Sequence, residues 1–220
     1  MDQSPFFNDA YFDETTQFFN ANGFAVLRVN FRGSGGHSKE LREAGKKQFG
    51  ELMLEDIYQA TLAVVQHQYI DKKRICTVGM SYGGYAAVAL TINHPEIYQC
   101  AVSLAGVMDV PYYTRSPHST EKQRSWIADQ VGNIETEYDE LKSISPVYNA
   151  AKLTQPILIT HGEKDQVVDV EHAYRMKLML EKHSKEFEWY IEPDGSHSFD
   201  NKEETYRFFN RTITFLRKNI

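Results

Sequence analysis

Short apolar runs alternate with longer amphipathic stretches along most of this chain. The apolar runs have the length and composition of buried strands and lie at residues 24–30, 75–78, 100–105, 156–161 and 187–192. Around them, apolar residues recur near helical spacing, which predicts helices over residues 12–21, 49–69, 85–93, 170–183 and 202–219. Strands that alternate with helices are typical of βαβ units. The pattern therefore predicts an α/β domain with a mostly parallel sheet and helices on both faces.

Other segments depart from this alternation. Residues 1–11 combine Pro5 with several aromatic side chains and indicate an irregular arm. Residues 31–38 are polar and glycine-rich, which predicts a loop, whereas Asn22-Gly23 predicts a helix end and Asp169 a helix N-cap. Residues 109–147 are aromatic and polar, and we expect short helices there that cover a functional site. No repeat or linker interrupts the chain, so we expect one domain over residues 1–220.

Composition and charge narrow the class of protein. The chain has 220 residues, 41% of them hydrophobic and 25% charged, as expected for a single soluble domain. A formal net charge of −6 and the lack of a basic stripe argue against nucleic acid as a partner. No apolar stretch reaches membrane-spanning length, and the first residues do not resemble a signal peptide. We therefore expect a cytoplasmic protein with no membrane partner, unless the chain was cut from a longer one.

Cysteines and glycine motifs bear on redox state and cofactors. Cys76 and Cys100 lie in apolar, strand-like runs, which favours buried free thiols in a reducing compartment over a disulfide. No HExxH motif, CxxC pair or acidic ligand cluster is present, so we expect no metal ion and no other cofactor. Glycines at positions 33–36 lack the G-x-G-x-x-G spacing of a dinucleotide site.

One five-residue motif carries the strongest chemical signal. Gly79-Met80-Ser81-Tyr82-Gly83 fits G-x-S-x-G and stands between a predicted strand and a predicted helix. In this context the motif forms a nucleophile elbow, a strained turn that exposes a serine and requires small neighbours at minus two and plus two. The helix that follows places positive potential where an oxyanion would form. The motif therefore predicts Ser81 as a nucleophile.

A nucleophilic serine needs a base and an orienting carboxylate. With an elbow of this kind the chain order is Ser, then Asp or Glu, then His, so both partners should follow later strands. Of the eight histidines, His197 alone lies in a small, flexible loop after the last strand, which favours it as the base. The rival His161 closes the preceding strand and is better explained by a structural role. His118 could lie at the rim of the site, and we expect solvated positions for His67, His94, His172 and His183.

Several carboxylates compete for the orienting role. Asp165 follows the penultimate predicted strand in Gly162-Glu-Lys-Asp165, which favours it, although an Asx-turn would explain it equally well. Glu163 lies in the same loop. Asp169 is explained as a helix cap and Asp194 as a turn residue beside Gly195.

With these residues placed, the chain resembles the catalytic α/β-hydrolase domain of the prolyl oligopeptidase family, nearest to the acylaminoacyl-peptidase and dipeptidyl-peptidase-like branch. The resemblance covers nearly the whole chain, and its most specific pieces are Asn30-Phe-Arg-Gly-Ser-Gly-Gly36, Gly79-Met-Ser-Tyr-Gly-Gly-Tyr85, His161-Gly-Glu-Lys-Asp165 and Gly195-Ser-His197. It implies a triad of Ser81, Asp165 and His197 and the backbone N–H of Tyr82 as an oxyanion donor. It also implies a specificity pocket lined by Tyr112, Tyr113 and Val168.

The chain departs from the family pattern in two ways. Full-length members carry a β-propeller before the hydrolase domain, and none is present in this sequence. Family members also have a strand ending in a His-Gly-Gly type loop, which contributes to the oxyanion hole and lies between the strands matching 24–30 and 75–78. A chain without it should have a gap in its sheet, and unpaired backbone in a buried gap is unfavourable. The chain could be a fragment, which we favour; the two flanking strands could pair directly; or a second copy could fill the gap.

The sequence thus predicts a serine hydrolase that acts on a peptide or small acyl substrate. A peptidase releasing short N-terminal units is the first hypothesis, and a carboxylesterase acting on small acyl esters uses the same residues. The hypothesis from another class is a truncated, inactive hydrolase domain that serves assembly, as a homo-oligomer or with a missing N-terminal segment.

Overall fold

The computed structural model describes residues 13–199 and 201–220. By its internal contacts the chain divides into two compact units, residues 1–70 and 71–220, and each is described here by itself. The predicted irregular arm at residues 1–11 lies outside the described residues.

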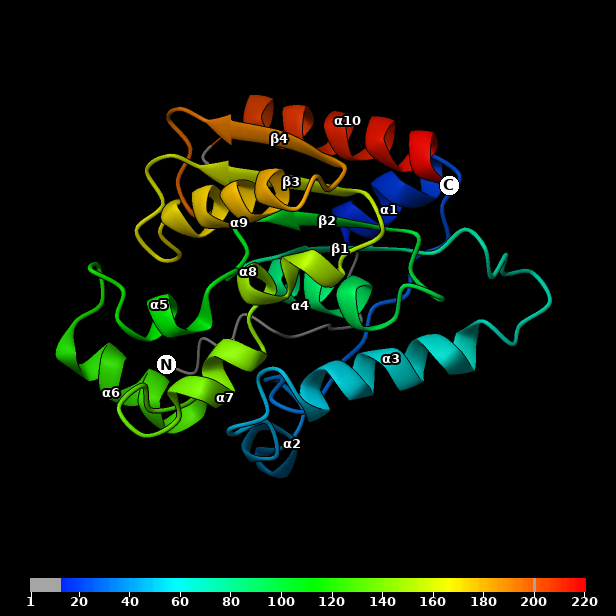
Figure 1. Cartoon of the computed structure of the whole chain (residues 1–220). Coiled ribbons are helices and arrows are strands. Elements are labelled where there is room, and N and C mark those ends of the chain that lie inside the picture. The colour runs from blue at the N-terminus through cyan, green and yellow to red at the C-terminus, as the bar shows by residue number, and fades with distance from the viewer. Residues whose placement is uncertain (1–12, 200) are drawn as a thin grey trace. The chain divides into compact units, whose positions relative to one another are not determined.

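The second unit is built on a parallel four-stranded sheet (Figure 1). Its strands are β1 (Cys76–Met80), β2 (Cys100–Leu104), β3 (Ile157–Gly162) and β4 (Phe187–Glu192), and they lie side by side in chain order. Every neighbouring pair is parallel, so the carboxyl ends of the strands lie at one edge. This confirms the predicted parallel sheet, and β4 has the bounds that its sequence pattern indicated.

Helices cover both faces of this sheet, as predicted. The helices α4 (Tyr82–Asn93) and α9 (Glu171–Lys182) contribute Val88 and Met176 to one core, which also contains Ile157 and Ile159 of β3. The last helix, α10 (Lys202–Asn219), packs against β2 and β3 from the opposite side (Figure 1). Its bounds match the prediction, whereas α4 begins at Tyr82, directly after Ser81, rather than at residue 85.

The loosely patterned segment folds into short helices, as its sequence indicates. These are α5 (Val110–Thr114), α6 (Glu121–Gln130), α7 (Tyr138–Ser143), α8 (Pro146–Asn149) and the 3-10 turn η1 (Ala150–Lys152). Local caps define two of them. Asp109 accepts a hydrogen bond from the N–H of Tyr112, and Thr120 and Gln123 form a capping box at the start of α6.

The first unit contains α1 (Glu14–Ala21), α2 (Lys39–Glu43) and α3 (Leu52–Val64). Asn22 and Gly23 end α1 as predicted, with Gly23 at a φ of 89°, where a side chain is disfavoured. The helix predicted over residues 49–69 is shorter. In the glycine-rich loop, the backbone N–H and the guanidinium of Arg32 all donate to the carboxylate of Asp56, at 2.7–2.9 Å. These hydrogen bonds lower the pKa of Asp56.

The strand predicted over residues 24–30 is wrong. These residues form no strand, and Val26 and Leu27 are 38% and 43% exposed. Direct pairing of this segment with the elbow strand is also wrong, because β2 is the only described strand that pairs with β1. The apolar composition of the segment indicates strand propensity, but a strand also needs a hydrogen-bonding partner. The predictions of a fragment and of a second copy filling the gap both stay open.

The prediction of free thiols is also wrong. Cys76 and Cys100 form a disulfide. They are direct register partners on the adjacent strands β1 and β2, with Cα atoms 4.7 Å apart, and this spacing lies within the range that a disulfide can bridge. The sequence places each cysteine in a strand, but it does not reveal that the two strands are neighbours in this register.

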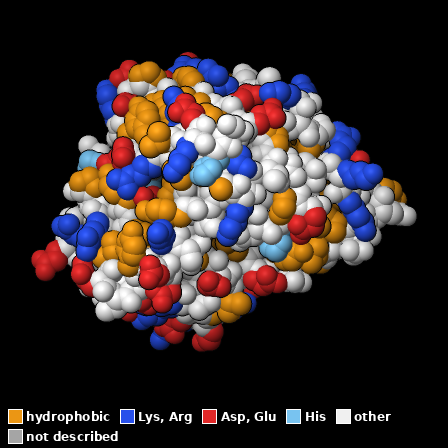
Figure 2. Space-filling model, in the orientation of Figure 1, with side chains coloured by type: hydrophobic (Ala, Val, Ile, Leu, Met, Phe, Trp, Pro, Cys, Tyr) orange, Lys and Arg blue, Asp and Glu red, His pale blue; other side chains and the backbone are white. Residues whose placement is uncertain are grey.

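The surface carries charges of both signs. Figure 2 shows lysine and arginine side chains interspersed with aspartate and glutamate on the face it presents, with no gathered basic stripe there. Within the described residues, no helix is long and apolar enough to cross a membrane.

Candidate active site

Ser81 occupies a strained turn at the carboxyl end of β1. Its φ and ψ angles are 57° and −120°, in a region that a serine rarely adopts. Its N–H donates to the carbonyl of Leu104 in β2 at 2.9 Å, and its carbonyl accepts from the N–H of Tyr85 in α4 at 3.1 Å. The backbone of Ser81 is therefore held between the neighbouring strand and the helix that follows, as the elbow motif predicts.

The two glycines of the motif have different roles. A Cβ on Gly79 would lie 2.2 Å from the carbonyl oxygen of Gly83, so the turn closes only with glycine at that position. A Cβ on Gly83 would meet nothing within 4 Å. The requirement for a small residue therefore falls on the minus-two position, and the structure shows no steric reason for glycine at plus two.

Tyr82 is the first residue of α4. The N–H groups in the first turn of a helix point along its axis toward the N-terminus, where the helix dipole is positive. The side chain of Tyr82 is buried and packs against the ring of Tyr85, 5.6 Å away between centroids. Tyr85 in turn donates its hydroxyl hydrogen bond to the carbonyl of Ile144 at 3.0 Å. This packing fixes the start of the helix behind Ser81.

Asp165 and His197 are joined by a hydrogen bond. Nδ1 of His197 lies 2.8 Å from Oδ2 of Asp165. The other oxygen, Oδ1, accepts from the N–H groups of Val167 at 2.8 Å and Val168 at 2.9 Å. The Asx-turn and the orienting role were posed as alternatives, and the geometry combines them: one oxygen stabilises the turn and the other contacts the imidazole.

The loops that carry Asp165 and His197 are locked together by their backbones. The N–H of Lys164 donates to the carbonyl of Gly195, and the N–H of Glu163 donates to that of Glu192, both at 2.9 Å. A Cβ on Gly162 would lie 2.3 Å from the carbonyl oxygen of Ser196. The approach that brings His197 to Asp165 therefore depends on glycine at position 162.

His161 is also in contact with Asp165, which the sequence did not lead us to expect. Its Nε2 lies 3.2 Å from Oδ2 of Asp165 and 2.8 Å from the carbonyl oxygen of Val168. His161 is 1% exposed. The sequence carries one signal for this contact: His161 and Asp165 are four residues apart, where the chain turns back after a strand.

Electrostatics keep the Asp165 carboxylate ionised. Burial by itself would raise the pKa of Asp165, but hydrogen bonds from His161, from His197 and from the N–H of Val168 outweigh it. Together these contacts hold the pKa of Asp165 well below its usual range. An ionised carboxylate is the form that can accept from a neutral or protonated His197.

The predicted pocket residues Tyr112 and Tyr113 lie on α5. Val168 lies in the loop of residues 163–170 that carries Asp165 between β3 and α9, called the acid loop below. The ring of Tyr112 packs under the guanidinium of Arg175, 4.1 Å from its centroid, and burial raises the pKa of Tyr112. Burial also raises the pKa of Tyr113. Val168 is 1% exposed; its N–H donates to Asp165, and its carbonyl oxygen contacts Nε2 of His161. A substrate-binding role for Tyr112, Tyr113 and Val168 stays a prediction.

His172 is buried, so the expectation of a solvated position is wrong. Its Nδ1 accepts the N–H of Asp109 at 3.1 Å, and its ring meets that of Tyr112 edge-on, 5.1 Å between centroids. Burial lowers the pKa of His172 to about 3. Its position on the inner face of α9, against α5, explains the difference, because sequence spacing did not indicate that α5 packs there.

The remaining candidates lie outside the contacts of Asp165. Glu163 accepts from the hydroxyl of Tyr174 at 2.8 Å, and Asp194 pairs with Lys164 at 2.6 Å in its turn. Asp169 accepts from the N–H of Glu171 at 2.8 Å, so it caps α9 from one residue before the formal N-cap, Val170. It also contacts Nε2 of His118 at 3.0 Å.

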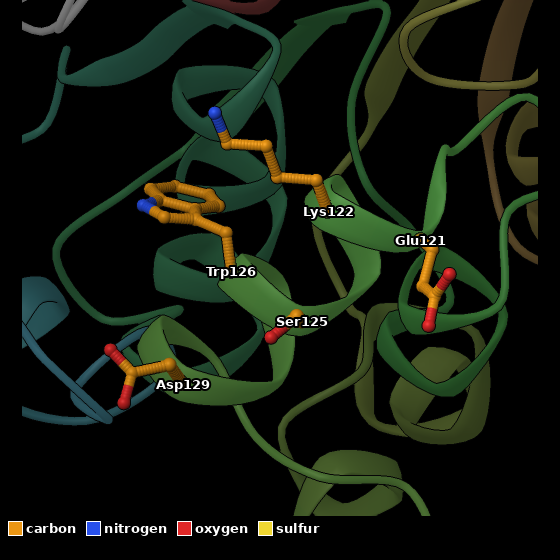
Figure 3. A pocket seen from close by; sticks show the side chains of 5 residues that line it. All are labelled: Glu121, Lys122, Ser125, Trp126 and Asp129. Atoms are coloured by element: carbon orange, nitrogen blue, oxygen red, sulfur yellow. The ribbon is translucent and has the colours of Figure 1, made fainter.

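Among the described residues, the hydroxyl of Ser81 makes no hydrogen bond to His197. Catalytic hydrogen bonds are often long before substrate binds, so the contact belongs to the proposal below. A separate surface hollow lies on α6, lined by the side chains shown in Figure 3: Glu121, Lys122, Ser125, Trp126 and Asp129. It contains none of the residues just described. The described part of the chain holds no group of three or more side chains suited to bind a metal ion.

Comparison with known proteins agrees with this architecture. The model of the prolyl oligopeptidase family matches residues 10–220. "Dipeptidyl peptidase family member 6" of Caenorhabditis elegans is 30% identical over 206 residues, covering 89% of this chain and 27% of the relative. "Dipeptidyl aminopeptidase BIII" of Pseudoxanthomonas mexicana is 27% identical over 222 residues, covering 96% of this chain and 31% of the relative.

A solved structure with the same fold is a puromycin-hydrolyzing peptidase of Mycobacterium tuberculosis. It superimposes with a TM-score of 0.81 at 22% identity, over 87% of this chain and 29% of that protein. At this level of identity the likeness shows the fold, which is that of an α/β-hydrolase. The chain spans less than a third of the length of the two curated relatives.

Proposed function

Because this chain belongs to the prolyl oligopeptidase family, we propose that it carries the catalytic site of a serine peptidase, with Ser81, His197 and Asp165 as its triad. The observation that carries this proposal is the hydrogen-bonded pair of Asp165 and His197, in loops that follow β3 and β4. Ser81 follows β1 at the same edge of the sheet, in the strained turn of a nucleophile elbow.

Each residue of the triad has a distinct role. His197 Nδ1–H donates to the ionised Asp165, which leaves Nε2 as the basic nitrogen that takes the Ser81 proton. Ser81 Oγ then bonds to the substrate carbonyl carbon, and His197 returns the proton to the leaving amine as the acyl-enzyme forms. Water then attacks the acyl carbon and gives a proton to His197; the bond to Ser81 Oγ breaks, Oγ takes that proton back, and the acid product leaves. Asp165 stabilises the protonated ring while it exists.

The oxyanion of the tetrahedral intermediate needs hydrogen-bond donors. The proposal places it at the N-terminus of α4, next to the N–H of Tyr82, where the helix dipole favours negative charge. One such donor was worth roughly 3–4 kcal/mol in a protease where it was removed. The proposal assigns one donor to the oxyanion, the N–H of Tyr82.

The proposed substrate is a peptide from which a short N-terminal unit is released. The names of the relatives, a dipeptidyl peptidase and a dipeptidyl aminopeptidase, support this class. The side chains of Tyr112 and Tyr113 on α5 would line the pocket for the residue at the cleaved bond, beside Val168 of the acid loop. In this proposal the side chains of α5 determine which substrate residue is accepted at the cleaved bond.

A cytoplasmic location belongs to this proposal; the Cys76–Cys100 disulfide of the structure argues against it and offers its test. Disulfides are rare in a reducing cytoplasm. Trapping of free thiols in freshly lysed cells, followed by mass spectrometry, should find the pair reduced if the protein is cytoplasmic. An oxidised pair would place the protein in an oxidising compartment.

The proposed activity is tested by hydrolysis of paired chromogenic substrates. A dipeptidyl nitroanilide and a nitrophenyl ester of a short acyl group report amide and ester cleavage by the same serine. We expect cleavage of the nitroanilide that falls at least about 10³-fold in Ser81→Ala and is unchanged in Ser125→Ala, a serine of the hollow on α6. Cleavage of the ester alone would favour a carboxylesterase. Cleavage that persists in Ser81→Ala would remove the proposal.

A further inference from the structure

We propose that His161 is a positioning residue for Asp165: its Nε2–H binds the same carboxylate oxygen as His197 and limits how strongly Asp165 stabilises the protonated His197 ring. The inference rests on the proposed function, in which Asp165 and His197 are acid and base. It gives a role to a buried imidazole that the triad itself does not use.

The two atoms that face Nε2 of His161 show which ring nitrogen carries the proton. This nitrogen faces Oδ2 of Asp165 at 3.2 Å and the carbonyl oxygen of Val168 at 2.8 Å. A carbonyl oxygen and an ionised carboxylate both accept, so Nε2 must donate. The hydrogen bond is therefore shared between the two oxygens, and the shorter distance is the one to Val168. This fixes the carboxylate and the turn at residue 168 relative to the end of β3.

The other nitrogen of the His161 ring has no acceptor for a second proton. Nδ1 is buried and has no hydrogen-bond partner among the described residues. A proton on Nδ1 would be a buried donor without an acceptor, which is unfavourable. The groups whose charges act on this cluster are Asp165 after β3, His197 after β4, and His172 and Arg175 on α9. Burial lowers the pKa of the neighbouring His172 to about 3, so that ring is neutral.

The shared oxygen has a chemical consequence. Oδ2 of Asp165 now accepts from two imidazole rings, with Nδ1 of His197 at 2.8 Å. Each donated hydrogen bond withdraws electron density from a carboxylate and lowers its basicity. Without the His161 donor, Oδ2 would bind the His197 cation more strongly. His197 would then be a stronger base at rest but would give up its proton to the leaving group less readily.

The test is a nitrogen-detected NMR titration of the histidine rings in the folded chain, which needs no turnover. In the wild-type protein, the ring of His161 should show a proton on Nε2 and none on Nδ1. In His161→Leu, the pKa of His197 should rise by roughly half a unit to one unit, as expected for the loss of one hydrogen bond to the carboxylate. His161→Gln keeps an N–H donor near the position of Nε2 and should restore most of the wild-type value.

Other outcomes overturn the inference. A proton on Nδ1 of His161, or a charged His161 ring in the wild-type protein, contradicts the geometry, and this holds even if His161→Leu does not fold. An unchanged or lower pKa of His197 in a folded His161→Leu also contradicts it. The matched control is His172→Asn, which removes an equally buried imidazole that does not contact Asp165 and should leave the pKa of His197 in place.

Failure of the proposed function is recognised separately. If Ser81 has no role in hydrolysis, the nitroanilide assay fails while the titration still reports whether His161 acts on Asp165 and His197. If the triad is active, kcat for the nitroanilide should fall about tenfold in His161→Leu with little change in KM, and His161→Gln should recover it.

Discussion

The two sides of the proposed triad are held in different ways. The proposed acid and base follow the neighbouring strands β3 and β4. The N–H of Glu163 donates to Glu192 at the end of β4, and the N–H of Lys164 donates to Gly195 in the loop that carries His197. The nucleophile stands on β1, which pairs with β2 alone among the described strands. The acid and base are therefore held by hydrogen bonds between the two segments that carry them. On the other side, the backbone of Ser81 is held by Leu104 in β2 and by Tyr85 in α4.

The difference concerns how many contacts orient each side chain of the proposed triad. The geometry around Asp165 includes four donors, from two rings and two backbone N–H groups, so the carboxylate needs nothing further to be oriented. The geometry around Ser81 fixes the backbone of the turn, and the proposal assigns one oxyanion donor there, the N–H of Tyr82.

The largest effect is expected from Asp165→Asn. The amide nitrogen that replaces Oδ2 would face the donors of both His161 and His197, so His197 would lose its preferred tautomer. In a protease with the same triad, this change lowered kcat by about 10⁴-fold. We expect a loss of about 10³- to 10⁴-fold in nitroanilide hydrolysis. Asp194→Asn is the matched control, because its carboxylate is 82% exposed and pairs only with Lys164 among the described contacts. A loss of less than tenfold in Asp165→Asn would contradict the account.

The elbow offers a matched pair of glycine substitutions. Gly79→Ala places a methyl group 2.2 Å from the carbonyl oxygen of Gly83, so the turn must open, and we expect about 1–3 kcal/mol lower stability with loss of activity. Gly83→Ala meets nothing within 4 Å and lies in the first turn of α4, so its stability should be unchanged or higher by up to about 1 kcal/mol. Urea unfolding of both variants makes the comparison. Equal destabilisation by the two would show that the elbow is not closed as described.

Acid should weaken the region around α5 and α9 through His172. Its pKa is about 3 in the folded chain against 6.5 as a reference, so between these values the unfolded chain binds a proton that the folded chain does not. Stability therefore falls as pH decreases from about 6.5, by at most about 1.4 kcal/mol per pH unit from this group. The lowered pKa of Asp165 acts in the same direction, below its reference value of 3.8.

The measurement is urea unfolding at pH 6.5 and 5.5 for the wild-type protein and His172→Asn. The asparagine keeps an acceptor for the N–H of Asp109 and does not titrate. We expect the wild-type protein to lose about 1 kcal/mol more than the variant over this interval. Parallel pH dependence of the two proteins would show that His172 is solvated after all.

The smallest effect is expected from Leu27→Ser. Leu27 is 43% exposed in a segment that forms no strand, so its removal should change the free energy of unfolding by less than about 0.5 kcal/mol. Leu158→Ala in β3, where the side chain is 2% exposed, should cost about 2–5 kcal/mol. If Leu27→Ser is as destabilising as Leu158→Ala, residues 24–30 are packed as a strand.

Much of the second unit follows from sequence because its signals are local. The apolar run of β4 and the amphipathic pattern of α10 define their own bounds, and the G-x-S-x-G motif specifies the strand, turn and helix around Ser81. The assignment of Asp165 and His197 followed from strand order, since parallel strands bring their following loops to one edge. The structure joins these two residues by a hydrogen bond, and their catalytic roles stay predictions.

The features that the sequence did not reveal depend on contacts between segments that are far apart along the chain. Residues 24–30 have strand propensity, but nothing local in the sequence shows whether they find a hydrogen-bonding partner. Cys76 and Cys100 are bonded because β1 and β2 align them in register, which a single sequence does not show. His161 and His172 were assigned by position along their elements, and their burial depends on the acid loop and on α5 packing against them.

The central claim is that Ser81 is an activated nucleophile, and labelling with a fluorophosphonate tests it most directly, because that reaction requires an activated serine and no leaving amine. The account predicts a covalent adduct that peptide mass spectrometry maps to Ser81, absent from Ser81→Ala and at least about 10³-fold slower to form in Asp165→Asn. An adduct on another serine, or labelling at Ser81 that does not depend on Asp165, would contradict the account.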